Sequence, residues 1–169
     1  MKWVLIAIGC FAALIAAMAA IGAMLPKGHR ATRRARFKQK PETIYTVISG
    51  PPGWRSDLRG FGNLPDKDGR KQWWEESQGH RITYELVEDV PPTRRVTRIA
   101  DKGLPFGGTW TLEIAPVSGG AALRVTEEGE VYNVIFRFMA RFVFGQTGTI
   151  ERFLRDLGKK LGERVEIEA

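Results

Sequence analysis

The stretch Glu127–Leu157, EEGEVYNVIFRFMARFVFGQTGTIERFLRDL, joins an extended segment to a helical one. Apolar residues recur at helical spacing within 133–144 and again within 150–161. The second run places its apolar side chains on one stripe: Ile150, Phe153, Leu154, Leu157 and Leu161. Gly145 and Gly148 separate the two runs, and glycine destabilises a helix interior. We therefore predict one long C-terminal helix with a weak point at these glycines, whose stripe needs an apolar surface to cover it.

Extended segments upstream of this helix supply such a surface. Turn-forming residues separate them: Lys71–Ser77, Ile82–Val90, Arg94–Asp101, Thr109–Val117 and Leu123–Val131. Side chains alternate between the two faces of a strand, so Tyr84 and Leu86 share one face, as do Trp110 and Leu112. Short alternating segments at this spacing predict an antiparallel sheet with one covered face and one wet face.

The residues before these segments predict a first strand and two short helices. Apolar and basic residues alternate in 30–37, with Arg33 breaking the pattern. Pro41–Ile48 has proline at a favourable first helical position, and Trp54–Arg59 is the candidate for a second short helix. The predicted fold class is therefore α+β: a strand, two short helices, a curved antiparallel sheet and a long helix that closes it.

The N-terminus carries a candidate transmembrane helix. Trp3 to Leu25 contains no charged residue and no proline. A helix of that length covers the hydrocarbon core of a bilayer, about 30 Å. The alternative is a cleavable signal peptide, for which Ala17–Ala19 offers a small-residue site. The run exceeds the usual signal-peptide core of about 7–15 residues, which favours an uncleaved, single-pass anchor.

The basic residues of the chain cluster directly after this segment. The formal net charge is +7, and the stretch Lys27 to Lys38 is rich in Lys and Arg and has no acidic residue. Residues 39–169 carry equal numbers of basic and acidic side chains. We therefore expect no nucleic-acid partner, because no second basic surface remains. The cluster predicts proximity to anionic headgroups and places the soluble domain on the cytoplasmic side of the membrane.

Three stretches carry a resemblance to a known superfamily. They are WRSDLRGFGNLPDKDGRKQWWEES (Trp54–Ser77), RRVTRIADKGLPFGGTWTLEI (Arg94–Ile114) and the stretch Glu127–Leu157 quoted above. In this order of elements, the chain resembles the START / polyketide cyclase–dehydrase superfamily (SRPBCC), with an added N-terminal transmembrane anchor. The resemblance implies a helix-grip fold and a cavity for an apolar ligand between sheet and helix. We divide the chain into an anchor (1–26), a START-like domain (27–163) and a C-terminal tail (164–169).

Aromatic and aliphatic side chains of the inner faces are the candidate ligand-lining residues: Trp73, Tyr84, Leu86, Trp110, Leu112, Phe138 and Phe142. Trp73 and Trp74 are adjacent, so only one can point inward from a strand, and we assign Trp73 to the inner face. Two interpretations stay open. The side chains line an apolar pocket, which is the usual form of a small-molecule site, or they fill the core completely.

Several chemistries find no support in the sequence. Cys10 is the single cysteine, and His29 and His80 have no neighbouring ligands at metal-binding spacing. The glycine pairs match no nucleotide-binding loop. The acidic runs are typical of solvated faces. We therefore name no catalytic residue, no metal ligand and no cofactor.

These observations predict a membrane-anchored protein that binds a hydrophobic or amphipathic small molecule, such as a lipid. Two alternatives remain. One is a cyclase/dehydratase-type enzyme that uses the same cavity, which requires titratable side chains buried together inside it. The other is a pocketless interaction module of a membrane complex, which requires an exposed apolar patch elsewhere.

Overall fold

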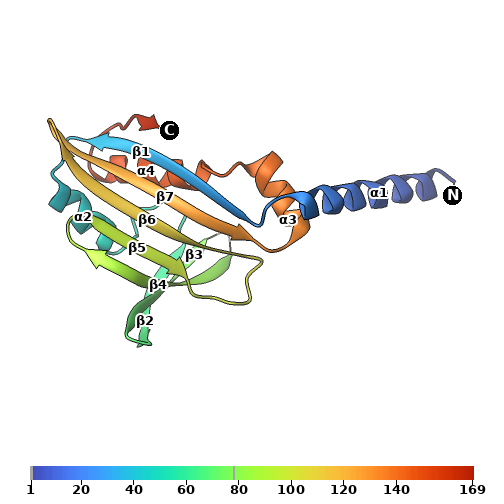
Figure 1. Ribbon diagram of the computed structural model, residues 1–169, viewed down its shortest axis with the longest axis horizontal. Helices are drawn as coiled ribbons and strands as arrows, with labels where there is room; N and C mark the ends of the chain where they lie inside the picture. The colour runs from blue at the N-terminus through green and yellow to red at the C-terminus, as the bar shows by residue number, and fades with distance from the viewer. Residues whose placement is uncertain (1, 78) are drawn as a thin grey trace.

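The computed structural model describes residues 2–77 and 79–169. Its helices, in chain order, are α1 (Lys2–Met24), α2 (Pro41–Ser49), α3 (Val134–Met139), the π-helical η1 (Ala140–Phe144) and α4 (Gly148–Lys160). Its strands are β1 (Gly28–Phe37), β2 (Gly60–Lys67), β3 (Arg70–Ser77), β4 (His80–Val90), β5 (Arg94–Ile99), β6 (Phe106–Val117), β7 (Gly120–Val131) and β8 (Ile167–Glu168). Figure 1 shows them as a curved sheet with helices behind it and α1 projecting from one end.

The described strands form one antiparallel sheet in the order β2-β3-β4-β5-β6-β7-β1-β8. Consecutive strands from β2 to β7 are neighbours, while β1 crosses to the far side and pairs with β7 along its whole length. The C-terminal residues expected as a tail add the short strand β8 to β1, with Ile167 opposite Ala35. The predicted antiparallel α+β architecture, of helix-grip type, is confirmed in these main features.

One face of the sheet, the inner face, is covered by α2 and α4 over only part of its width. The buried members of the core come from β1, β6, β7, α2 and α4, and the fully enclosed ones include Leu123, Leu154 and Leu157. Arg33, which breaks the apolar alternation of β1, lies on the inner face, where its Nε donates to Glu151 of α4 at 3.2 Å. The β3–β4 half of this face contributes no residue to that core.

The region around Trp54–Arg59 corrects the prediction of a second short helix. These residues form a loop of turns between α2 and β2. Two of its backbone donors have partners outside the loop, since the Ser56 N–H donates to Asp156 and the Arg59 N–H donates to Glu76. In a helix over 54–59 the Arg59 N–H would instead donate to the carbonyl oxygen of Arg55.

The C-terminal helix also differs from the prediction, because it is broken rather than merely weakened. The chain leaves helical geometry at Gly145, whose φ is 73°, and α4 begins at Gly148. After the break α4 packs on the sheet, whereas α3 packs against α1. An apolar stripe requires burial but does not specify the partner that provides it.

Helix α1 projects away from the sheet and is exposed along most of its length (Figure 1). It spans 23 residues with a mean hydropathy of 2.7 in its most apolar window, so it is long and apolar enough to cross a membrane. Large apolar side chains such as Trp3 and Phe11 are 82% and 65% exposed. Such a surface is costly in water and stable in hydrocarbon.

Candidate functional site

A row of aromatic side chains crosses the inner face from the edge of the core, where Trp110 packs edge-on against Phe153 of α4 with ring centroids 5.5 Å apart, to β3. Trp73 of β3 and Tyr84 of β4 are directly opposite in register, and their rings stack with centroids 5.9 Å apart. Leu86 and Trp110 continue the row on β4 and β6, and all four side chains are half-buried. Trp74 points to the outer face, where the Arg81 guanidinium lies 3.9 Å from its ring centroid.

The structure separates the predicted lining residues into three groups. Trp73, Tyr84, Leu86 and Trp110 form the row just described. Leu112 is 5% exposed and belongs to the core beneath the helices. The rings of Phe138 and Phe142 contact each other beyond the sheet, with centroids 4.9 Å apart, and are not part of this row. This corrects the prediction that a closing helix brings them onto the inner face, because α3 packs against α1 instead.

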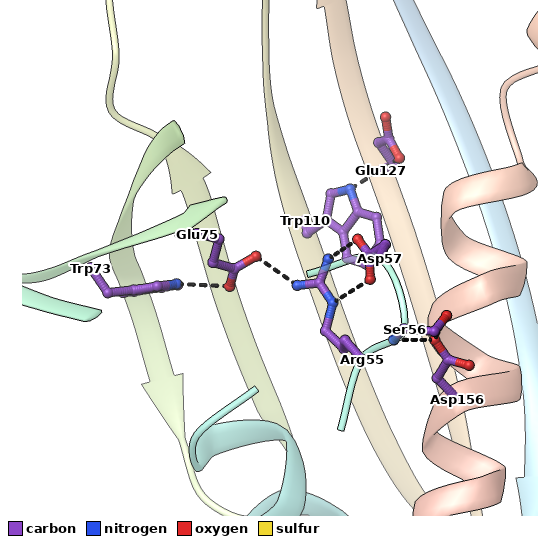
Figure 2. Close-up of polar contacts among 8 residues, drawn as sticks. All are labelled: Arg55, Ser56, Asp57, Trp73, Glu75, Trp110, Glu127 and Asp156. Carbon is purple, nitrogen blue, oxygen red and sulfur yellow. Dashed lines mark hydrogen bonds and ion pairs between the residues drawn. The ribbon is translucent and has the colours of Figure 1, made fainter. Parts of the chain in front are cut away.

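Arg55 stands at the centre of a polar cluster beside the aromatic row (Figure 2). Its Nε and Nη2 donate to the two carboxylate oxygens of Asp57 at 3.2 and 2.8 Å, and its Nη1 donates to Glu75 at 2.7 Å. The Arg55 side chain is 14% exposed and that of Glu75 is 9% exposed. Burial alone would lower the pKa of Arg55, but the charges of Glu75 and Asp57 raise it, so the guanidinium is always charged.

Glu75 connects this ion pair to the aromatic row. Its second carboxylate oxygen accepts a hydrogen bond from Trp73 Nε1 at 3.0 Å. Tyr84 lies beside the same groups. Burial, followed by the negative charge of Glu75, raises the pKa of the Tyr84 hydroxyl far above its ordinary value. This hydroxyl therefore stays protonated and neutral, and it can donate a hydrogen bond.

A second carboxylate, Glu127 of β7, lies further along the inner face, opposite Trp110 in register. It accepts a hydrogen bond from Trp110 Nε1 at 3.0 Å and lies 3.5 Å from His29 Nε2. Burial raises the pKa of Glu127, while His29 and the Trp110 hydrogen bond partly offset that rise. Burial of Glu127 therefore favours the protonated form of its carboxyl.

The loop that carries Arg55 is fixed to α4 by one carboxylate. Asp156 accepts hydrogen bonds from the Ser56 backbone N–H at 2.8 Å and from its hydroxyl at 2.5 Å (Figure 2). Burial raises the pKa of Asp156, but the Ser56 hydrogen bonds and Lys159 outweigh it and lower the pKa overall. The ionised Asp156 thus holds the loop over the inner face. Trp54, from the same loop, packs against Phe153 with ring centroids 5.3 Å apart.

The polar members of the cluster were not among the predicted site residues. From the sequence, the acidic runs are predicted to be solvated faces, and His29 has no neighbouring ligand at metal-binding spacing. One available signal was the period of two, which puts Glu75 on the same face as Trp73, as the register shows. Arg55 and Asp57 gave no such signal, because a loop's position over a sheet depends on tertiary contacts. Within the described residues, no three His, Cys, Asp or Glu side chains converge as metal ligands.

Replacing Glu127 tests its raised pKa through stability. A carboxyl with a raised pKa in the folded state favours folding at low pH, and that contribution is lost as pH rises through the folded-state pKa. Glu127→Gln is therefore expected to be as stable as the wild type or more stable at pH 7, with the advantage disappearing in acid. Urea unfolding of the full chain in detergent at several pH values measures this difference.

Glu128→Gln provides the control, because Glu128 is the adjacent residue on the exposed outer face. Its free energy of unfolding should not acquire this pH dependence. A Glu127→Gln variant that becomes less stable than the wild type as pH rises from acid to neutral would show that the carboxyl is stabilised as an anion.

Comparisons with known proteins identify the fold. No protein-family model and no curated protein matches the chain. Among solved structures, it is similar to a conserved protein from Geobacillus kaustophilus (TM-score 0.62, 13% identity, 83% of this chain and 100% of that one). It is also similar to norcoclaurine synthase from Thalictrum flavum (TM-score 0.59, 12% identity, 82% and 90%).

A third similar structure is the di-domain ARO/CYC protein StfQ of the steffimycin biosynthetic pathway, with a TM-score of 0.58 and 12% identity. The match covers 80% of this chain and 52% of that one. These neighbours establish a fold of the helix-grip type for the sheet and the helices that pack on it. At such low identity they establish the fold alone, and the chemistry must be argued from the site.

Proposed function

We propose that this chain is a membrane-anchored protein that binds an amphipathic small molecule, in the first instance a lipid, on its inner face. The apolar part of the ligand lies against the row Trp73, Tyr84, Leu86 and Trp110. Its polar group meets the cluster around Arg55, Glu75 and Glu127. The observation that carries the proposal is the juxtaposition of half-buried aromatic rings with buried charged groups on the inner face, where β3 and β4 contribute no residue to the core and Trp110 packs at its edge.

The energetics support a functional role for this cluster. Removing charged side chains from water costs several kcal/mol for each ion, and a buried ion pair often adds little or no net stability. If the inner face had only a structural role, apolar side chains in place of these charged groups would stabilise the fold at least as well. Groups with perturbed pKa values, such as Tyr84 and Glu127, concentrate at functional sites. The aromatic row adjoining them offers apolar contact area, which drives the binding of apolar ligands.

Helix α1 is proposed to hold this domain at the membrane that supplies the ligand. Its length and exposed apolar surface support a bilayer span. Basic residues follow the helix and only Lys2 precedes its apolar core, which favours a cytoplasmic location for the domain. Retention of α1 is favoured by its contact with α3, because a cleaved signal helix would leave that surface unpaired.

Adjacent tryptophans on opposite faces provide a matched test of ligand binding. The full chain is purified from cells in mild detergent and analysed by native mass spectrometry, with extraction of bound small molecules. We expect the wild type and Trp74→Ala to carry the same ligand. Trp73→Ala should lower its occupancy by about tenfold or more, as the loss of a central aromatic contact does in other interfaces. Equal occupancy in the two variants would exclude the aromatic row as the site.

The same cluster favours a second candidate function, general acid–base catalysis on the bound molecule. Glu127 has a raised pKa next to His29 and is the candidate acid–base group, while the Tyr84 hydroxyl stays protonated and can donate a hydrogen bond in the same region. The extracted molecule is returned to wild type and to Glu127→Gln, and its mass is followed over time. A change of mass with wild type alone supports catalysis. An unchanged molecule with both supports binding without reaction.

A further inference from the structure

Helix α3, which lies before the break at Gly145, packs against α1. Gly22 is the residue of α1 that is buried, and its backbone contacts that of α3 directly. A Cβ at position 22 would lie 1.9 Å from the carbonyl oxygen of Val134, so only glycine permits this approach. Figure 1 shows α3 beside the last turns of α1, at the end of the sheet where β1 begins. The segment following α1 is therefore held against the rest of the protein.

Arg137 fixes this junction from inside. It is 7% exposed, and its guanidinium donates to the carbonyl oxygens of Gly22 and Leu25, each at 3.0 Å. It also donates to the carbonyl oxygens of Val131 at 3.1 Å and Tyr132 at 3.3 Å. Carbonyl groups at a helix C-terminus lack partners within the helix and carry partial negative charge. The Arg137 guanidinium therefore provides partners for carbonyl groups at the C-terminal end of α1.

A hollow of about 290 Å³ opens next to this junction. Its polar and charged lining consists of Lys27, His29, Arg30, Arg137, Arg141 and Gln146, and no acidic residue contributes to it. Lys27, Arg30 and Arg141 are exposed. Arg30 has a loose pair with Glu128 at 3.7 Å, and His29 contacts Glu127. Among the described residues, Lys27 and Arg141 have no ion-pair partner, so the hollow carries unbalanced positive charge.

Exposed apolar side chains flank the hollow on α3 and η1. Ile135 and Phe136 are 37% and 40% exposed, and Phe142 and Val143 are 59% and 58% exposed. Apolar and aromatic residues combined with arginine are typical of helices that lie in the membrane interface. Helix α3, which carries part of this surface, is in contact with α1.

We propose that this hollow binds the phosphate of an anionic phospholipid from the bilayer that α1 spans, with the lipid's acyl chains against the exposed side chains of α3 and η1. The inference rests on the membrane anchor of the proposed function and adds a defined lipid site to it. Lysine and arginine are the side chains that bind phosphate groups in proteins. The hollow lies immediately after the last turn of α1, at the level where the headgroups of the membrane lie.

The test uses the full chain in nanodiscs of phosphatidylcholine with a minor fraction of phosphatidylglycerol. Native mass spectrometry counts the phosphatidylglycerol molecules that stay with the protein after the disc is released. The site variant is Lys27→Gln/Arg30→Gln/Arg141→Gln. The control variant, Arg36→Gln/Lys38→Gln/Lys40→Gln, removes the same formal charge from exposed positions at the other end of β1. Thermal unfolding of each variant first verifies that it is folded.

We expect the site variant to lose retained phosphatidylglycerol by about tenfold or more, and the control to keep it. Equal loss in both variants would overturn the proposal, because it would show general attraction to basic charge. Inorganic phosphate is added to lipid-free protein in detergent as a second arm. Phosphate bound there, with no enrichment of phosphatidylglycerol from discs, would assign the hollow to a soluble phosphate and overturn the lipid assignment.

Flotation of the full chain with vesicles separates this proposal from the one on which it rests. A wild-type protein that fails to float, or that is removed from vesicles by alkaline carbonate, contradicts the membrane anchor and therefore both proposals. A protein that floats in every variant but shows no selective lipid retention contradicts the lipid site alone. A site variant that floats and loses the lipid supports both.

Discussion

Arg55→Ala is expected to lower the free energy of unfolding by about 3–5 kcal/mol, the range observed when one partner of a buried ion pair is removed. The substitution leaves Asp57 and Glu75 facing each other without the guanidinium that bonds both. The two carboxylates are then left as unpaired charges at a site where all three side chains are less than 15% exposed. Urea unfolding of the full chain in detergent, followed by tryptophan fluorescence, measures the loss.

Arg94 gives the matched control. It also bonds two carboxylates, Glu88 at 3.0 Å and Glu113 at 2.8 Å, but it lies on the outer face and is 37% exposed. Arg94→Ala should cost no more than about 1 kcal/mol, because water replaces the lost bonds. Similar losses for both arginines would contradict the burial argument.

The triple change Arg55→Met/Asp57→Asn/Glu75→Gln extends this test, because it removes all three charges together. It should regain much of the stability that Arg55→Ala loses, as replacement of a whole buried ion cluster often does. It should also lose ligand occupancy, since the polar side of the proposed site is gone. A triple variant that remains as unstable as Arg55→Ala would show that the cluster's role is structural.

Arg137→Met is expected to release the junction between α1 and the rest of the chain. Methionine keeps an apolar stem but removes the donors to the carbonyls of Gly22, Leu25, Val131 and Tyr132. Each acceptor that stays buried without a partner costs about 1–3 kcal/mol. Tryptic cleavage after Lys27, measured in vesicles, should therefore accelerate by about tenfold to a hundredfold, because local opening controls the cleavage rate.

Arg141→Met is the control for this junction. Arg141 is exposed and lies four residues further along the same helical segment. Its replacement removes an equal charge without touching the end of α1, so cleavage after Lys27 should proceed at the wild-type rate. Acceleration in both variants would assign the effect to charge at the membrane surface instead of to the buried hydrogen bonds.

The sheet and its faces were predictable because they follow from a period of two. Alternation alone places Tyr84 and Leu86 on one face, and the pairing of β3 with β4 places Trp73 opposite Tyr84. Arg33 interrupted the pattern because it makes an ion pair with Glu151 across the layers. From the sequence alone, a charged residue on an inner face is only an irregularity in the apolar alternation, because the helix that carries its ion-pair partner is not known.

The partners of α3 and the polar cluster were not predictable for a different reason. The apolar side chains of 133–144 fit a helix that covers a sheet and a helix that packs on α1 equally well. The structure has the second arrangement, which is held by the close backbone approach at Gly22 and by hydrogen bonds from Arg137 to carbonyl oxygens. Such interactions produce no periodic pattern in the sequence. The position of Arg55 was not predictable for the same reason, because its two acidic partners come from its own loop and from β3 and meet only in the folded chain.

The central claim is that a small molecule occupies the inner face beside Trp73. Its most direct test is photo-cross-linking in cells with p-benzoylphenylalanine placed at position 73 or, in a separate protein, at position 74. These adjacent positions differ in the face to which they point. A discrete small-molecule adduct at position 73 and none at 74, seen by mass spectrometry of the intact chain, is the predicted result. Adducts of equal yield at both positions, or no small-molecule adduct at 73, would contradict the account.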